Sequence, residues 1–151
     1  MVGAVVLDYS FLNDKAKEIF EDYLYRDVID IIEGAKKTKS PIEQILWVII
    51  ARDLRDTKFW PVPQKSFYFN DKHYIVDIAI EIVETGETLC VIECDGHDYH
   101  EKTKEQAIND RKRDRAFQAE GIPIFRFTGT EIYNDPYSCA RELKNFLRKY
   151  L

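Results

Sequence analysis

The chain has 151 residues, of which 45% are hydrophobic and 32% are charged. This size and composition are typical of one globular domain with a buried core, and they exclude a largely disordered chain. The formal net charge of −5 also argues against an overall cationic field for binding nucleic acid. Basic residues are nevertheless concentrated in the short runs 36–39 and 111–115, so a local basic groove is compatible with the acidic total.

The cysteine count and the first residues indicate a cellular compartment. Three cysteines, an odd number, favour free thiols in a reducing environment over a disulfide framework. The opening "MVGAVVLDYS" lacks the basic region and cleavage pattern of a secretory signal, and no apolar run reaches the length of a membrane span. We therefore expect a cytoplasmic protein with no membrane partner.

Two helices are predicted in the first third of the chain. Apolar residues recur at helical spacing over 10–33, and Gly34 is the expected stop, followed by a basic linker. In "SPIEQILWVIIARDL", Ser40 is placed as the N-cap, Pro41 lies in the first turn and Glu43 stands three residues after the cap. This pattern predicts a capped helix with one apolar face for the core.

The hydrophobic period changes to two after "FWPVPQ", whose prolines are expected to break helicity. Strands are predicted in "KSFYF", "HYIVDIAIEIV" and "TLCVIEC", separated by the turn sequences "NDK" and "ETGE". A helix over about 102–120, ended by Gly121, precedes a strand in "IPIFRF", and a last helix covers 136–150. The order ααβββαβα predicts an α/β (α+β) fold with a mixed sheet flanked by helices. The hairpins should be antiparallel, and the strands that flank the crossover helix should be parallel.

Three carboxylates stand in strands that are otherwise apolar. Asp77 interrupts "YIVDIAI", while Glu93 and Asp95 lie at the C-terminal end of "LCVIECD". Alternation places Glu93 and Asp95 on one face, and Asp77 shares it if the intervening turn is odd in length or contains a bulge, for which Gly86 is suited. Clustered buried carboxylates need protons, partners or a cation, and their oxygens suit Mg²⁺ or Mn²⁺. The alternative is a solvated sheet face or simple pairing with Lys and Arg.

A zinc site competes for the same stretch. Cys90, Cys94, His97 and His100 are zinc-type ligands within a short segment. However, Cys90 and Cys94 are four residues apart on an extended strand, which separates them by about 13 Å. This is too far for one tetrahedral site unless the strand is broken, so we expect no zinc here.

An ordered set of short motifs runs from residue 43 to residue 132. It comprises "EQILW" with Glu43, then Gln64, "YIVDIAI" with Asp77, "VIECDGHDYH" with Glu93, Asp95, Gly96 and His100, and "DRKRDRAFQAEGIPIFRFTGTEI" with Asp110, Arg113, Gly121, Arg126 and Glu131. In this order and spacing, the set resembles the small PD-(D/E)xK-superfamily endonucleases related to very-short-patch repair endonuclease (DUF559-like). The individual motifs are weak, but the ordered set is fairly specific.

The resemblance implies a restriction-endonuclease-like fold and a metal-dependent endonuclease with DNA as its partner. In a single domain over 1–151, residues 40–132 would form the nuclease-like core, with the 10–33 helix and the 136–150 helix outside it. Asp77 and Glu93 would hold Mg²⁺ or Mn²⁺ with help from Asp95, while Glu43 would hold a metal-bound water and His100 would act as general acid or base. The residues expected to contact the substrate are Gln64, Asp110, Arg111, Lys112 and Arg113.

Two departures from the superfamily pattern leave the catalytic role of each residue open. Val76 stands where the motif has proline, and Asp95 stands where it has lysine. Gln64, His100 or a lysine of the following helix could take the place of the motif lysine, and His100 is the first choice. A catalytically inactive nucleic-acid-binding module and a plain interaction domain are the alternative functions.

Overall fold

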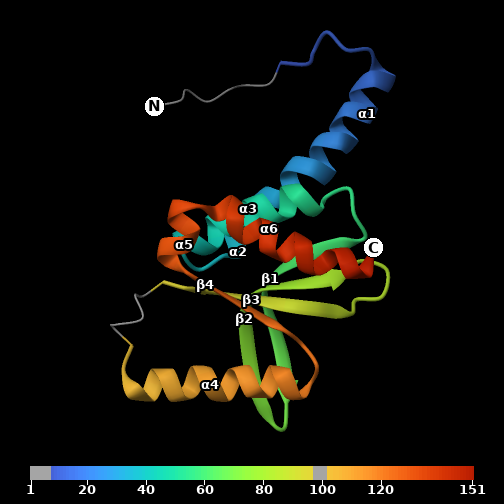
Figure 1. Cartoon of the computed structure of the whole chain (residues 1–151). Helices are drawn as coiled ribbons and strands as arrows, with labels where there is room; N and C mark the ends of the chain where they lie inside the picture. The colour runs from blue at the N-terminus through green and yellow to red at the C-terminus, as the bar shows by residue number, and fades with distance from the viewer. Residues whose placement is uncertain (1–7, 97–101) are drawn as a thin grey trace.

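The computed structural model describes residues 8–96 and 102–151, without the side chains of residues 26 and 27. It is a mixed α/β fold in which a four-stranded sheet lies between helices (Figure 1). The helices are α1 (Asp14–Leu24), α2 (Asp30–Lys37), α3 (Pro41–Leu54), α4 (Lys104–Ala119), α5 (Gly129–Asn134) and α6 (Pro136–Leu147), and the strands are β1 (Phe59–Phe69), β2 (Lys72–Ile82), β3 (Thr88–Asp95) and β4 (Ile124–Thr128). A π-helical turn over Tyr25–Ile29 links α1 to α2, and a 3₁₀ turn follows α6.

The sheet has the predicted mixed topology. Its strand order is β1-β2-β3-β4, with antiparallel pairs except between β3 and β4, which are parallel and joined through α4. At the β1–β2 hairpin, Asn70 and Asp71 have φ of 48° and 61°, as a two-residue turn between right-twisted strands requires. Gly121, with φ of 73°, follows α4 as predicted and turns the chain into β4.

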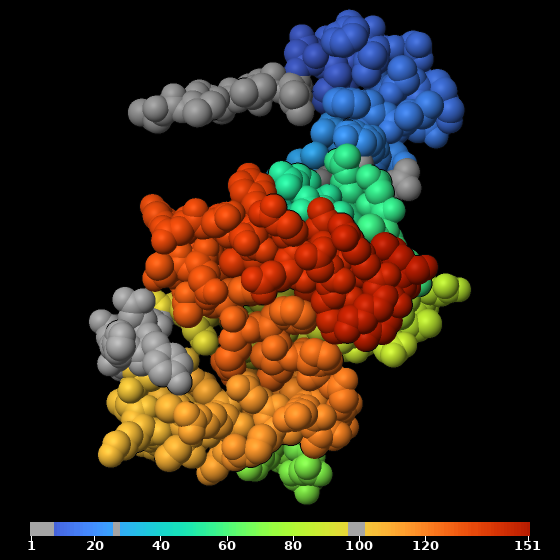
Figure 2. Space-filling view, viewed as in Figure 1, coloured from blue at the N-terminus to red at the C-terminus, as the bar shows by residue number. Residues whose placement is uncertain are grey.

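Helices cover both faces of the sheet. Helices α3, α5 and α6 lie on one face, while α4 lies on the other (Figure 1). The core on the α3 side is the larger, and it includes Trp47, Ile78, Ile80 and Ile92. On the α4 side, Phe117 is fully buried against a smaller apolar cluster. Helix α1 contains no buried residue and projects from the rest of the molecule (Figure 2).

Two predicted boundaries are wrong, and both errors have a tertiary cause. Helix α2 continues past Gly34 to Lys37. This glycine is needed for packing, because a Cβ there would lie 1.9 Å from Cζ2 of Trp47. Strand β1 begins at Phe59 and runs through Pro61 and Pro63, where a break was expected. The prolines are tolerated because β1 is an edge strand with one unpaired side. Helix α5 was not predicted.

Candidate active site

A β-bulge brings Asp77 and Glu93 to the same face of the sheet. The hairpin between β2 and β3 pairs Glu81 with Thr88 but Ile80 with Cys90, so the register shifts by one residue beside Leu89. Continued along the strands, the shifted register places Asp77 across from Glu93, where an unbulged hairpin would place it across from Ile92. Directly opposed residues share a face, so the observed bulge meets the condition that the sequence set for these two acids to converge.

Glu93 is a buried acid with an incompletely satisfied carboxylate. Its residue is 8% exposed, and its Oε1 lies 2.5 Å from Nη2 of Arg113 on α4. Apart from this ion pair, neither Glu93 Oε1 nor the buried Nε of Arg113 has a hydrogen-bond partner among the described residues. Burial raises the pKa of Glu93 to about 7, although the Arg113 charge opposes the shift.

Asp77 lies beside Glu93 in a partly satisfied environment. Its Oδ2 accepts a hydrogen bond of 2.7 Å from the backbone N–H of Cys94 on β3. Burial raises the pKa of Asp77, the Cys94 N–H lowers it, and the negative charge of Glu43 raises it further. Asp77 and Glu93 therefore form an acidic pair that protons or cations must neutralise.

Glu43 reaches the same region from α3. It is 5% exposed, and its backbone N–H donates to the Ser40 side chain as the predicted cap requires. Its carboxylate Oε2, however, accepts from the Lys39 N–H at 2.8 Å, one residue before the cap, and from Nε2 of Gln64 at 2.9 Å. Gln64 has a φ of 52°, a conformation that a non-glycine residue seldom adopts. Glu43 and Gln64, both predicted from the sequence as site residues, are thus hydrogen-bonded to each other beside Asp77.

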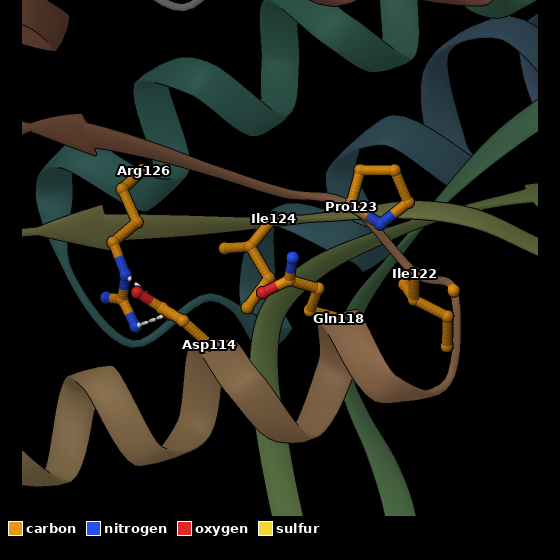
Figure 3. A pocket seen from close by; sticks show the side chains of 7 residues that line it. Asp114, Gln118, Ile122, Pro123, Ile124 and Arg126 are labelled. Carbon is orange, nitrogen blue, oxygen red and sulfur yellow. Dashed lines mark hydrogen bonds and ion pairs between the residues drawn. The ribbon is translucent and has the colours of Figure 1, made fainter.

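Asp95 is held by two cations. Its carboxylate lies 3.2 Å from Nη1 of Arg126 on β4 and 3.4 Å from Nζ of Lys102. The same cations also pair with acids of α4. Lys102 contacts Asp110 at 2.7 Å. Arg126 contacts Asp114 at 2.7 Å, as Figure 3 shows. Arg126 is also the cross-strand partner of Glu93 and lowers the pKa of that carboxyl, so the network is electrostatically coupled to the Asp77–Glu93 pair. Over the described ranges, 8–96 and 102–151, no three His, Cys, Asp or Glu side chains are arranged to hold a metal ion.

The network lines one of several open pockets along α4. A pocket of about 410 Å³ is bordered by Asp95, Lys102, Asp110, Arg111 and other residues. A second pocket, of about 610 Å³, lies beyond the Arg126–Asp114 pair between α4 and the start of β4 (Figure 3). A third, of about 260 Å³, is lined by Lys72, Tyr74, Asn109, Asp110, Lys112 and Arg113.

The predicted substrate contacts on α4 therefore divide between pockets. Arg111 borders the Asp95 pocket, Lys112 and Arg113 border the smallest one, and Asp110 borders both. His100, the predicted general acid or base, lies outside the described residues, as does His97.

Lys102 and Arg126 were not among the predicted site residues. Both approach Asp95, one from the segment before α4 and the other from β4. A signal for Arg126 was present, because it is a lone charge in the apolar strand "IPIFRF", just as Asp77 is in "YIVDIAI". Lys102 has no comparable signal, apart from the expectation that a lysine of the following helix could serve the site.

The four-stranded mixed sheet, flanked by helices, is consistent with a restriction-endonuclease-like fold. The family model REase_MTES_1575 matches residues 49–147, and the chain belongs to this restriction endonuclease-like family. Membership indicates a nuclease in general terms. No curated protein and no solved structure matches the chain. The matched range includes Asp77 and Glu93 but begins after Glu43.

Among the described residues, no helix is both long enough and apolar enough to cross a membrane.

Proposed function

We propose that this protein is a metal-dependent DNA endonuclease that hydrolyses phosphodiester bonds. The observation that carries the proposal is the buried Glu93 carboxylate, which lies on the same sheet face as Asp77 and whose Oε1 has only the Arg113 guanidinium beside it among the described residues. A second support is the family, whose nuclease character makes a phosphodiester the natural substrate. The proposal retains the resemblance to very-short-patch repair endonuclease as an expectation.

Asp77 and Glu93 are the proposed ligands of Mg²⁺ or Mn²⁺. Their donor atoms fit a hard divalent cation, because carboxylate oxygens are the ligands such ions prefer. The burial of Glu93 supports this fit, since a buried carboxylate needs a cation beside it and its Oε1 has only the Arg113 guanidinium among the described residues. When bound, the ion would polarise the phosphoryl group and lower the pKa of the attacking water.

The remaining acids and His100 receive supporting roles in this proposal. Glu43, held by Lys39 and Gln64, would orient water near Asp77. His100 is proposed as the general acid or base because imidazole exchanges protons near neutral pH. Asp95, which was expected to help hold the metal, is now proposed to fix Lys102 and Arg126 in place. Lys102 thereby brings a positive charge to the strand position where the superfamily motif has lysine.

The pockets along α4 supply a surface for the DNA backbone. Lys102, Lys104, Arg111 and Arg126 border the pocket beside Asp95, and cationic side chains are the usual partners of phosphate oxygens. These four cations outnumber the three carboxylates of the same pocket, Asp95, Asp110 and Asp114, which supports DNA binding although the chain as a whole has a net charge of −5. DNA is therefore the proposed partner, and the backbone is the part of it these residues would contact.

Nicking of supercoiled plasmid with added Mg²⁺ or Mn²⁺ tests the proposal. Asp77→Ala and Glu93→Ala should each reduce the nicking rate by about 100-fold or more, because metal polarisation contributes several kcal/mol to such reactions. Glu84→Ala is the matched control, since it removes an exposed carboxylate from the turn after β2 and should leave the rate unchanged. Wild-type nicking no faster than that of Asp77→Ala would refute the enzymatic assignment for this substrate.

A catalytically inactive DNA-binding module is the second candidate. It is favoured by the ion pairs of Asp95 and by the lack of a three-ligand metal cluster among the described residues. Binding without cleavage, equally tight in EDTA and in Mg²⁺ and steeply weakened by salt, would support this reading over the first.

A further inference from the structure

Arg113, on α4, contacts Glu93 of the Asp77–Glu93 pair and also lines a surface pocket. Its Nη2 is 2.5 Å from Oε1 of Glu93, and the same group donates to the backbone carbonyl of Ile75. Arg113 also lines the pocket of about 260 Å³ that contains Lys72 and Lys112. The side chain therefore joins the proposed metal site to a cationic surface.

The contact between Arg113 and Glu93 is a charge pair without full hydrogen bonding. Glu93 is more than nine-tenths buried, and its Oε1 has no partner but the Arg113 guanidinium, while the buried Nε of Arg113 has no acceptor among the described residues. A buried ion pair is stable only when its remaining donors and acceptors are satisfied. The guanidinium thus neutralises Glu93 while leaving its carboxylate able to accept a better-fitting cation.

Given the metal-dependent function proposed above, on which this inference rests, we infer that Arg113 is a resident counter-cation which a divalent metal displaces. Without metal, Arg113 occupies the place of positive charge beside Glu93. When a divalent ion takes that place, the guanidinium loses its anionic partner and is free to turn into the pocket of Lys72 and Lys112. There it meets a phosphate of the DNA backbone. Arg113 is in this sense a positioning residue that couples metal binding to substrate binding.

Mn²⁺ affinity, measured on the full chain by the electron paramagnetic resonance of free Mn²⁺ at one neutral pH, tests the competition. Arg113→Met should bind Mn²⁺ about tenfold more tightly than the wild type, a factor that corresponds to about 1.4 kcal/mol. The matched control is Arg115→Met, which removes the same charge from an exposed position two residues along α4 and should change the affinity little. Equal or weaker Mn²⁺ binding by a folded Arg113→Met variant would overturn the inference.

The wild-type protein provides a measurement that does not depend on a variant retaining its fold. In a spectrum of ¹⁵N-labelled arginine side chains, Mg²⁺ should shift the Nε resonance that is missing from Arg113→Lys. If Mg²⁺ binds and that resonance does not move, Arg113 is not displaced. If neither wild type nor Arg113→Met binds any divalent ion, the proposed metal site fails together with this inference. Metal binding that ignores Arg113 overturns this inference alone.

The salt dependence of DNA binding tests the second half of the coupling. Each phosphate contact made by a cation steepens the dependence of log K on log salt by about 0.9 for duplex DNA. Between wild type and Arg113→Met, the slopes should agree in EDTA and differ by about one contact in Ca²⁺, a probe chosen to occupy the site without cleavage. Arg115→Met should show the same slope difference from wild type in both solutions. A slope for Arg113→Met that differs from wild type equally with and without Ca²⁺ would overturn the proposed displacement.

Discussion

Replacing Glu93 with glutamine isolates the cost of keeping a carboxylate buried beside Asp77. Burial raises the pKa of Glu93 from its ordinary value of 4.5 to about 7. Below pH 4.5 the group is protonated in both folded and unfolded chains, so its contribution to stability is fully present. Between pH 4.5 and 7 the folded protein retains the proton that the unfolded chain has lost, and stability falls as the pH rises. At about 1.4 kcal/mol per pH unit, the loss across this window is about 3 kcal/mol.

The assay is urea unfolding of wild type and Glu93→Gln in EDTA at several pH values from 4.5 to 8. Other titrating groups largely cancel in the difference between the two proteins. The free energy of unfolding of Glu93→Gln, relative to wild type, should therefore increase with pH by about 3 kcal/mol and then level off above pH 7. Glu84→Gln, at an exposed turn position, should give a flat difference. A flat difference for Glu93→Gln would mean that Arg113 compensates the buried charge completely, and a decrease with pH would reverse the sign of the reasoning.

Two further predictions concern the support of the site. Gly34→Ala should destabilise the fold by about 2 kcal/mol or more, because its Cβ would overlap the Trp47 ring. Lys36→Ala on the same helix is the control, and both variants are compared by thermal unfolding. Equal unfolding temperatures for the two variants would contradict the packing explanation. Gln64→Ala loses the hydrogen bond to Glu43 and keeps the unfavourable φ, whereas Gln64→Gly loses the bond and relieves the backbone. Chemical denaturation should therefore find the glycine variant more stable by about 1 kcal/mol, and the opposite order would contradict the strain at this position.

Local signals in the sequence were sufficient for most of the fold. The strands β2 and β3, the Ser40 cap and the left-handed Gly121 were predicted from nearby residues, and the structure confirms each of them. Gly34 could not be understood in this way. Its role depends on the Trp47 ring, which belongs to another helix. The sequence therefore predicted the end of a helix at Gly34, whereas the structure has a close packing contact there.

The sequence predicted which strand residues of the candidate site could share a face, but not which ion pairs they form. Alternation showed that Asp77 could share a face with Glu93 only through an odd turn or a bulge, and the structure has such a bulge beside Leu89 rather than at Gly86. The ion pairs of Asp95 did not follow from alternation, because Arg126 and Lys102 come from a neighbouring parallel strand and from the segment that leads into α4. Strand alternation predicts which residues share a face, but the choice of ion-pair partner depends on how the crossover helix lies on the sheet.

These ion pairs also predict that a divalent metal should strengthen the binding of DNA by this acidic chain. Cations at the site are already matched by carboxylates, with Arg113 on Glu93 and both Lys102 and Arg126 on Asp95. Phosphates must compete with those carboxylates, so a divalent ion that occupies Glu93 should raise DNA affinity by freeing Arg113. Linkage requires the reciprocal effect, in which DNA raises metal affinity by the same factor. Ca²⁺ titrations with and without DNA, compared with DNA titrations with and without Ca²⁺, should give one common factor in the wild type. That factor should be smaller in Arg113→Met, and an undiminished factor would assign the coupling to other cations of the site.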